Sequence, residues 1–138
     1  MFSDDVDRIF ADLFPGGRHG ASSEARAPVD AYLTDGDPPT LTVELDVAGV
    51  DPSRVRVELV EDVLVIRGER RRGGVPGRRA YRIAEIGWGP FERRLRLGMA
   101  VDAERSSAEY ENGILRIALP LAPKPPLRRV GITVRGTG

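Results

Sequence analysis

Residues 108–120, with the sequence AEYENGILRIALP, decide the fold class. Asn112-Gly113 is a strong hairpin signal, because both residue types tolerate a positive φ. Ile114, Ile117 and Leu119 follow as a strand, which Pro120 ends. The stretch therefore predicts two antiparallel strands joined by a tight turn, with a structural role for Gly113 in that turn.

The chain upstream of this hairpin shows the same strand pattern. Apolar residues alternate with polar ones in short runs, and turn-forming clusters separate the runs at intervals of about ten residues. Short strands at such spacing are typical of a β-sandwich or barrel, so we expect a sandwich of seven or eight strands. The predicted strands are residues 29–33, 41–47, 55–59, 63–66, 91–97, 104–110 and 114–119.

Composition excludes several classes of site. The 138 residues are 41% hydrophobic, which is enough for a core, and they contain no cysteine, which rules out disulfides and thiolate chemistry. The single histidine, His19, lies in a Gly-rich linker, where a general base or metal ligand would lack rigid support. We therefore expect no catalytic residues, no metal and no cofactor.

The N-terminal segment reads MFSDDVDRIFADLF, with early acids and no uninterrupted apolar run. It is unlike a signal peptide, and no segment is long enough to span a membrane, so a cytoplasmic location without membrane association is expected. Apolar residues of 1–14 fall at helical spacing, and Ser3 is a suitable N-cap. A lone helix this short is marginal in water, so it needs a surface on which to lie.

The net charge is zero, but the charges are segregated. Residues 1–39 carry 8 acids and 3 arginines, a balance of −5, whereas residues 67–96 carry 10 arginines and 3 acids, a balance of +7. An acidic arm on one chain could meet a basic loop on another, or both segments could simply be solvated. The run RGERRRGGVPGRR also resembles an RG-rich binding segment, but its arginines are not interleaved with stacking aromatics, so no nucleic-acid partner is expected.

Residues 68–90 form a connection longer than compact domains normally use without a function. The segment is rich in Arg and Gly up to Arg79, after which Tyr81, Ile83 and Ile86 are apolar. This alternation predicts a short strand within the loop.

The chain ends with the triplet Ile132-Thr133-Val134, which follows a proline-rich segment. In an extended chain Ile132 and Val134 point to the same side, so together they can dock at a sheet edge. The segment before them reaches on the order of 25 Å, which favours docking on a neighbouring molecule. Pairing within its own sandwich is the alternative.

Together these segments resemble the α-crystallin domain of the small heat-shock proteins, over residues 28–134. The stretch AEYENGILRIALP fits the family's A-x-x-x-N-G-[VI]-L-x-I-x-[LV]-P signature. WGPFERRLRL is similar to the aromatic-G-x-F-x-R-x-x-x-L strand, with Phe91 and Arg93 in the marked positions, and PVDAYLTDG and LDVAGVDPSRVRVELVEDVLVIRGER are similar to the opening strands. Ile132 and Val134 match the I-x-[IV] tail anchor. The chain departs from the usual Pro, Pro and Lys at Ala48, Gly98 and Leu121.

The resemblance implies an all-β, immunoglobulin-like sandwich at residues 28–121, with a helical arm at 1–27 and a tail extension at 122–138. It implies an ATP-independent holdase chaperone that binds unfolding proteins, assembles from strand-swapped dimers and passes its clients to ATP-dependent chaperones. In the swap, Tyr81, Arg82 and Ile83 would pair with a partner's Asp30, Ala31, Tyr32 and Leu33. The tail-docking groove would include Val57, Leu59 and Ala108. The apolar arm residues suit client binding, although they could instead only pack inside the oligomer: Phe2, Val6, Ile9, Phe10, Leu13 and Phe14.

Arg93 is expected to be a structural residue that faces inward beside Phe91 and Leu95. A charge there needs a carboxylate or main-chain carbonyls as partners. Two other functions compete with the holdase. One is a non-oligomeric co-chaperone adaptor on a related sandwich fold, and the other is a small RG-type RNA-binding protein.

Overall fold

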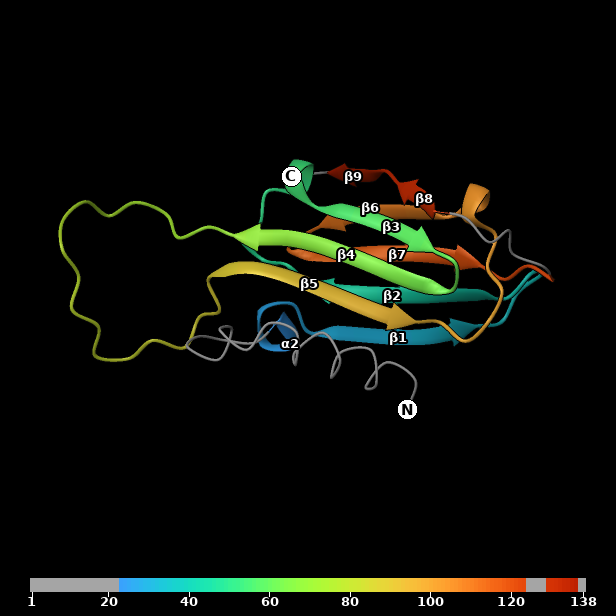
Figure 1. Ribbon diagram of the computed structural model, residues 1–138, viewed down its shortest axis with the longest axis horizontal. Helices are drawn as coiled ribbons and strands as arrows, with labels where there is room; N and C mark the ends of the chain where they lie inside the picture. Colours follow the sequence, from blue (N-terminus) through green and yellow to red (C-terminus); the bar gives the residue numbers. More distant parts are fainter. Residues whose placement is uncertain (1–22, 124–128, 137–138) are drawn as a thin grey trace.

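The computed structural model describes residues 23–123 and 129–136, which form two β-sheets packed face to face (Figure 1). The larger sheet has the strand order β1-β2-β7-β6-β9, and the smaller sheet has the order β5-β4-β3-β8. This arrangement confirms the predicted all-β sandwich. The strands are β1 (Val29–Thr34), β2 (Thr40–Asp46), β3 (Arg56–Val60), β4 (Val63–Arg70), β5 (Gly89–Arg96), β6 (Ser107–Glu111), β7 (Ile114–Pro120), β8 (Arg129–Ile132) and β9 (Val134–Gly136).

The Asn112-Gly113 turn joins β6 to β7 as the sequence predicts. Asn112 has a φ of 52° and Gly113 a φ of 84°, which is the conformation that a tight hairpin requires. A Cβ atom on Gly113 would lie 3.1 Å from the Cβ of Ala48, and the Gly113 carbonyl accepts a hydrogen bond of 2.8 Å from the Val47 amide. The turn therefore also contacts the end of β2.

Strand β4 continues four residues beyond its predicted end at Ile66, up to Arg70. The additional residues pair with the start of β5, where Gly68 lies opposite Phe91. A Cβ atom on Gly68 would lie 2.6 Å from the Cζ of Phe91, so the aromatic ring occupies the space above the glycine. The Arg/Gly-rich composition of 67–70 suggested a loop, but the cross-strand packing of Phe91 makes it a strand.

The predicted strand over residues 104–110 is wrong at its start. A 3-10 turn, η3 (Ala103–Arg105), precedes β6, and the Asp102 carboxylate accepts hydrogen bonds from the amides of Glu104 (3.1 Å) and Arg105 (3.3 Å). This is the capping geometry that Asp favours. Residues 107–111 alone form the strand.

The predicted strand around Tyr81 is absent from the described single chain, in which residues 71–88 are a loop. A strand needs an edge with which to pair, and this loop projects away from both sheets (Figure 1). The helix expected over residues 1–14 lies outside the described residues. One short helix, α2 (Ser23–Arg26), precedes β1, and a 3-10 turn, η2 (Pro52–Arg54), precedes β3.

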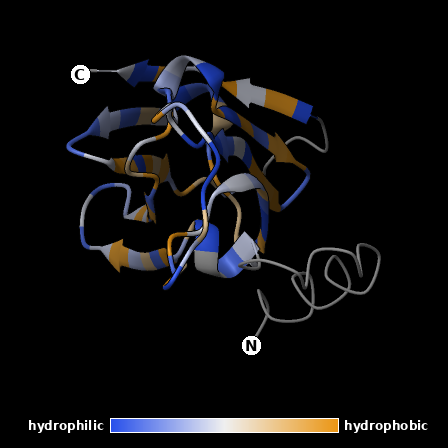
Figure 2. Ribbon diagram, turned by 90° about the vertical axis from the view of Figure 1, so that its left-hand side faces the viewer, coloured by the Kyte–Doolittle hydropathy of each residue, from blue (hydrophilic) through white to orange (hydrophobic). Residues whose placement is uncertain are grey.

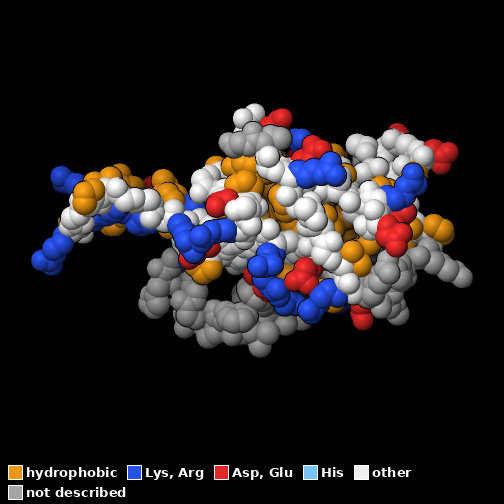
Figure 3. All heavy atoms as spheres, turned by 90° about the horizontal axis from the view of Figure 1, so that it is seen from above, with side chains coloured by type: hydrophobic (Ala, Val, Ile, Leu, Met, Phe, Trp, Pro, Cys, Tyr) orange, Lys and Arg blue, Asp and Glu red, His pale blue; other side chains and the backbone are white. Residues whose placement is uncertain are grey.

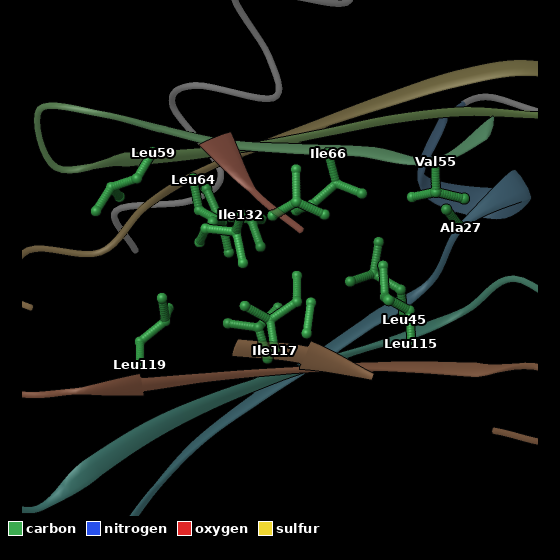
Figure 4. Packing of buried hydrophobic residues seen from close by; sticks show 14 of the residues in the cluster. Ala27, Leu45, Val55, Leu59, Leu64, Ile66, Leu115, Ile117, Leu119 and Ile132 are labelled. Atoms are coloured by element: carbon green, nitrogen blue, oxygen red, sulfur yellow. The ribbon is translucent and has the colours of Figure 1, made fainter. Parts of the chain in front are cut away.

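The core lies between the two sheets and consists mainly of residues from β2 to β7, with Ile132 of β8, whereas β1 and β9 contribute only the partly buried Val29 and Val134 (Figures 2 and 4). Burial of these side chains from both sheets supplies the main stabilisation of the sandwich. The largest fully buried residues are Leu45, Leu64, Ile66, Leu115, Ile117, Leu119, Val43, Val47 and Val101.

Candidate functional site

The tail covers the edges of both sheets on one lateral side of the sandwich, which we call the closed side. Strand β8 pairs antiparallel with β3, with Ile132 opposite Val57 and Val130 opposite Leu59. Strand β9 then pairs parallel with β6, with Val134 opposite Ala108. The structure thus brings the three groove residues Val57, Leu59 and Ala108 against the tail of their own chain.

Ile132 is the tail residue that enters the core. Its side chain is buried and lies beside Leu59 and Leu64, facing Ile117 of the opposite sheet (Figure 4). Val130 and Val134 are half-buried and pack against the same cluster, whereas Thr133 is exposed. The alternation of buried and exposed residues is that of an extended segment with one apolar side.

A chain of charges crosses the outer face of the smaller sheet and ends at the tail. Glu58 on β3 contacts Arg129 of β8 at 3.2 Å and Arg67 of β4 at 3.4 Å. Arg67 also pairs with Glu92 of β5, which accepts a hydrogen bond of 2.8 Å from Arg94. Partial burial raises the pKa of Glu92, but the hydrogen bonds from the two arginines outweigh that effect and hold the pKa below its ordinary value.

The opposite lateral side, the open side, consists of β1, β5 and the 71–88 loop that leads into β5. Within residues 23–123 and 129–136, strand β1 pairs only with β2, which leaves its other edge without a strand partner there, and residues 30–34 are exposed. Tyr32 and Leu33 are 41% and 53% exposed. In the loop the exposed fractions are 74% for Val75, 53% for Tyr81, 76% for Ile83 and 65% for Ile86. Figure 3 shows hydrophobic and basic side chains gathered on this projecting loop.

The structure does not pair the two predicted swap segments within one chain. Asp30, Ala31, Tyr32 and Leu33 lie on β1, opposite Glu44, Val43, Thr42 and Leu41 of β2. Tyr81, Arg82 and Ile83 lie in the loop and belong to no strand. Both segments are accessible, and they carry four of the six large exposed hydrophobic side chains found among the described residues, Tyr32, Leu33, Tyr81 and Ile83. The other two, Val75 and Ile86, lie elsewhere in the 71–88 loop.

Arg93 faces inward from β5, as the sequence predicts. It is 8% exposed, between the buried Phe91 and Leu95, and its Nη1 donates a hydrogen bond of 3.0 Å to the carbonyl oxygen of Ala27. The sequence led us to expect either a carboxylate or a main-chain carbonyl as the partner of Arg93, and the Ala27 contact is of the second kind. Arg93 thus connects β5 to the segment that leads into β1.

A second buried arginine, Arg70, was missed in the sequence, where it reads as part of a solvated RG-rich run. It is 8% exposed, and its Nε donates to the carbonyl of Ala48 at 2.7 Å. Its Nη1 donates to the carbonyls of Arg26 (2.7 Å) and Gly87 (3.1 Å), and its Nη2 to that of Asp46 (3.5 Å). One guanidinium therefore joins the residues before β1, the end of β2 and the end of the loop. A clue lay in the position of Arg70 at the end of a β-run, three residues before Gly73-Gly74.

A shallow hollow beside Arg70 is lined by Pro28, Asp46, Ala48, Gly49, Ile86 and Trp88. The described residues contain no group of three or more His, Asp or Glu side chains that could hold a metal ion. Within the same part of the chain, no helix is long and apolar enough to cross a membrane. The six predicted client-binding residues, Phe2, Val6, Ile9, Phe10, Leu13 and Phe14, lie outside the described residues.

Comparison with known proteins places this sandwich in a family. Residues 35–133 match the Hsp20/alpha crystallin family. An 18 kDa heat shock protein of Streptomyces albus G is 31% identical over 128 residues, which cover 93% of this chain and 86% of that protein. A 16.9 kDa class I heat shock protein of Triticum aestivum is 35% identical over 133 residues, covering 94% and 85% of the two chains.

Solved structures show the same fold. The structure of hspA from Xanthomonas axonopodis is 30% identical with a TM-score of 0.62, covering 70% of this chain and 94% of that one. A small heat-shock protein from Xylella fastidiosa, described as having a distinct high order structure, is 25% identical with a TM-score of 0.58, covering 76% and 95%. The family match spans β2 to β8 and ends at Thr133, so that only β1 and β9, the outer strands of the larger sheet, lie outside it. The chain belongs to the Hsp20/alpha crystallin family of small heat-shock proteins.

Proposed function

We propose that this protein is an ATP-independent holdase, which binds unfolding proteins and prevents their aggregation. Its family supports a chaperone role with oligomeric assembly. One observation carries the finer proposal: the large exposed hydrophobic residues of the described chain lie only on β1 and the 71–88 loop. Exposed apolar surface concentrated in two segments marks an interaction site. No catalytic step is part of the proposed activity.

The first level of assembly is a strand-swapped dimer. Among the described residues the outer edge of β1 has no strand partner, so alternate residues within Asp30, Ala31, Tyr32 and Leu33 present unpaired main-chain groups there. Tyr81, Arg82 and Ile83 of a partner's loop add to that edge as a strand. This pairing supports dimerisation because it satisfies the main chain and covers Leu33 and Ile83 together.

The second level uses the tail. The groove beside Val57, Leu59 and Ala108 accepts Val130, Ile132 and Val134 of the same chain. A neighbour's tail can make identical contacts there, since the groove recognises the sequence and not the chain that carries it. We propose that exchange from the chain's own tail to a neighbour's tail joins dimers into larger oligomers.

Clients bind the apolar residues of the arm, from Phe2 to Phe14. A tethered, apolar and adaptable segment suits a binder of many partners. Client proteins are then released to ATP-dependent chaperones, and we propose that the protein works in the cytoplasm.

The experiment is to heat a fragile client enzyme with the full chain, without ATP, and to follow light scattering. Suppression at near-stoichiometric amounts is expected, and unchanged scattering would refute the holdase. Native mass spectrometry of Leu33→Asp and Ile83→Asp tests the dimer separately. Both variants should shift the protein to monomer, whereas Glu111→Asp, an exposed control on β6, should not.

A non-oligomeric co-chaperone adaptor is the alternative. The tail that covers its own groove favours it, because a chain with no vacant groove offers no anchor point to its neighbours. A wild-type protein that stays monomeric in the native mass spectrum and does not suppress aggregation would favour the adaptor.

A further inference from the structure

The 71–88 loop is a basic and apolar surface. It carries five arginines, Arg71, Arg72, Arg78, Arg79 and Arg82, against the single acid Glu85, a balance of +4. Residues 71–86 are all exposed, including Val75, Ile83 and Ile86. The pairing of Tyr81–Ile83 with β1 proposed above would use only part of this surface. The segment around Val75 and Arg78 needs another explanation.

Two of the arginines hold the loop in a defined shape. Arg79 donates from Nη2 to the carbonyls of Gly73 (2.9 Å) and Val75 (3.2 Å), and from Nη1 to the Tyr81 hydroxyl (3.1 Å). The Arg72 guanidinium lies 4.7 Å from the ring centroid of Tyr81 and 5.3 Å from that of Trp88. Because the loop is already ordered, a ligand that binds it loses less conformational entropy on binding.

The segment that precedes the described domain starts at the base of this loop. Arg70 joins the carbonyls of Arg26 and Gly87 through one Nη1 atom. The Ser23 hydroxyl accepts a hydrogen bond of 3.1 Å from the Glu92 amide, and Arg26 donates to the Pro90 carbonyl at 2.7 Å. The chain therefore enters the described domain, at Ser23, near the base of the loop.

The tether is long enough for contact. Residues 15–22 span up to about 26 Å when extended, at about 3.3 Å per residue. A loop of the length of 71–87 that returns to its base reaches at most about 28 Å from it, by the same rise. The start of the chain is thus long enough to reach most of the loop, and covalent attachment through a connection of this length gives an effective concentration of about 1 mM.

The chemistry of the two segments is complementary. Residues 1–14 carry four aspartates, Asp4, Asp5, Asp7 and Asp12, against Arg8, a balance of −3. The same residues carry Phe2, Ile9 and Phe10 among their apolar side chains. We propose that the acidic, apolar arm docks on the basic, apolar 71–88 loop of its own chain. This docking goes beyond the holdase proposal and does not depend on it.

The chain is well suited to a direct test, because it has one tryptophan, Trp88 at the loop base, and no cysteine. A dye attached to Ser3→Cys in the full-length protein accepts energy from Trp88 when the arm is docked. We expect transfer that falls by about half as salt rises from about 0.05 to 0.5 M, since exposed ion pairs are screened over that range. Transfer that does not change with salt would contradict the proposal.

Charge exchange supplies the matched control. Arg71→Glu with Arg78→Glu should reduce transfer, as should Asp4→Lys with Asp7→Lys, and the four changes together should restore it. Arg72 and Arg79 stay unchanged because they hold the loop. Failure of the combined variant to recover transfer overturns the proposal.

Two further measurements distinguish what binds the 71–88 loop: the arm of the same chain, the arm of a partner chain, or a nucleic acid. Labelled chains are diluted into excess unlabelled Trp88→Phe protein, and transfer should persist; its loss would assign the arm to a partner's loop. A single-stranded oligonucleotide should not reduce transfer at about 0.15 M salt. If it binds the wild-type chain and abolishes transfer, the loop is a nucleic-acid site and the proposed arm docking is wrong. Suppression of client aggregation is measured separately on the same variants. The holdase proposal and the arm-docking proposal can therefore each be refuted without the other.

Discussion

The two lateral sides of the sandwich differ in whether their edge strands are covered by further strands. On the closed side, β8 and β9 cover the edges of β3 and β6 and insert the apolar Ile132 into the core. On the open side, no described strand covers the outer edge of β1, and the 71–88 loop leaves apolar side chains exposed. An uncovered edge is an aggregation hazard in a monomer, so its retention favours a specific partner on the open side.

The two sides are also stabilised by different kinds of interaction. The closed side depends on apolar burial and strand pairing, which a second chain's tail could supply equally well. The open side depends on two buried guanidinium groups, Arg70 and Arg93, which bind main-chain carbonyls within their own chain. The open side should therefore keep its shape through assembly, whereas the closed side can exchange its tail.

The largest expected effect comes from removing Arg70, which supports the open side. Arg70→Met retains bulk but leaves the carbonyls of Asp46, Ala48, Arg26 and Gly87 without this donor. We expect the free energy of unfolding to fall by about 3–4 kcal/mol, because hydrogen bonds to charged groups contribute about 1.5–3 kcal/mol each and are not additive. Urea unfolding followed by Trp88 fluorescence measures it.

The neighbouring Arg71 provides the control. It is exposed and pairs only with Glu69 at 2.8 Å among the contacts described. Arg71→Met should change stability by less than about 0.5 kcal/mol. Arg70→Lys should fall between the two, since an ammonium cannot reproduce the guanidinium's fork of donors. Equal stability of Arg70→Met and Arg71→Met would show that the carbonyl contacts do not hold the open side.

This contrast also explains what the sequence could and could not predict. The alternating strands and the Asn112-Gly113 turn follow from local rules, and the structure confirms them. The role of Arg70 depends on carbonyls 17 to 44 positions away in the chain, at Gly87, Ala48, Asp46 and Arg26, so no local pattern reveals it. The apolar spacing of Ile132 and Val134 predicts a docking segment, and the family resemblance implies the groove for it. Whether its own or a neighbour's tail fills the groove depends on chain tethering, which the sequence pattern does not encode.

The next effect tests the closed side. Ile132→Ala with Val134→Ala should lower the free energy of unfolding by about 2–3 kcal/mol, because Ile132 is buried in the core while Val134 is only half-buried. The variant should remain folded as dimers and lose every larger species in native mass spectra. Thr133→Ala, an exposed change between the two, is the control. Large oligomers that survive the double change would make the tail a strand of its own sandwich and nothing more.

The smallest effect concerns the charges that connect the two sides across β8, β3, β4 and β5. Glu92 has a lowered pKa in the folded chain, so its contribution to stability is present above the ordinary glutamate pKa, about 4.3, and is lost as pH falls through the lower folded value. In the Glu92→Gln variant, the free energy of unfolding should therefore fall less steeply as the pH is lowered below about 4.3. The change should be below about 1 kcal/mol, because the partner side chains Arg67 and Arg94 stay partly exposed and solvent screens their ion pairs with Glu92. Glu111→Gln, on the exposed face of β6, should leave the profile unaltered, and identical acid limbs for Glu92→Gln and the wild type would show that these charges do not couple the two sides.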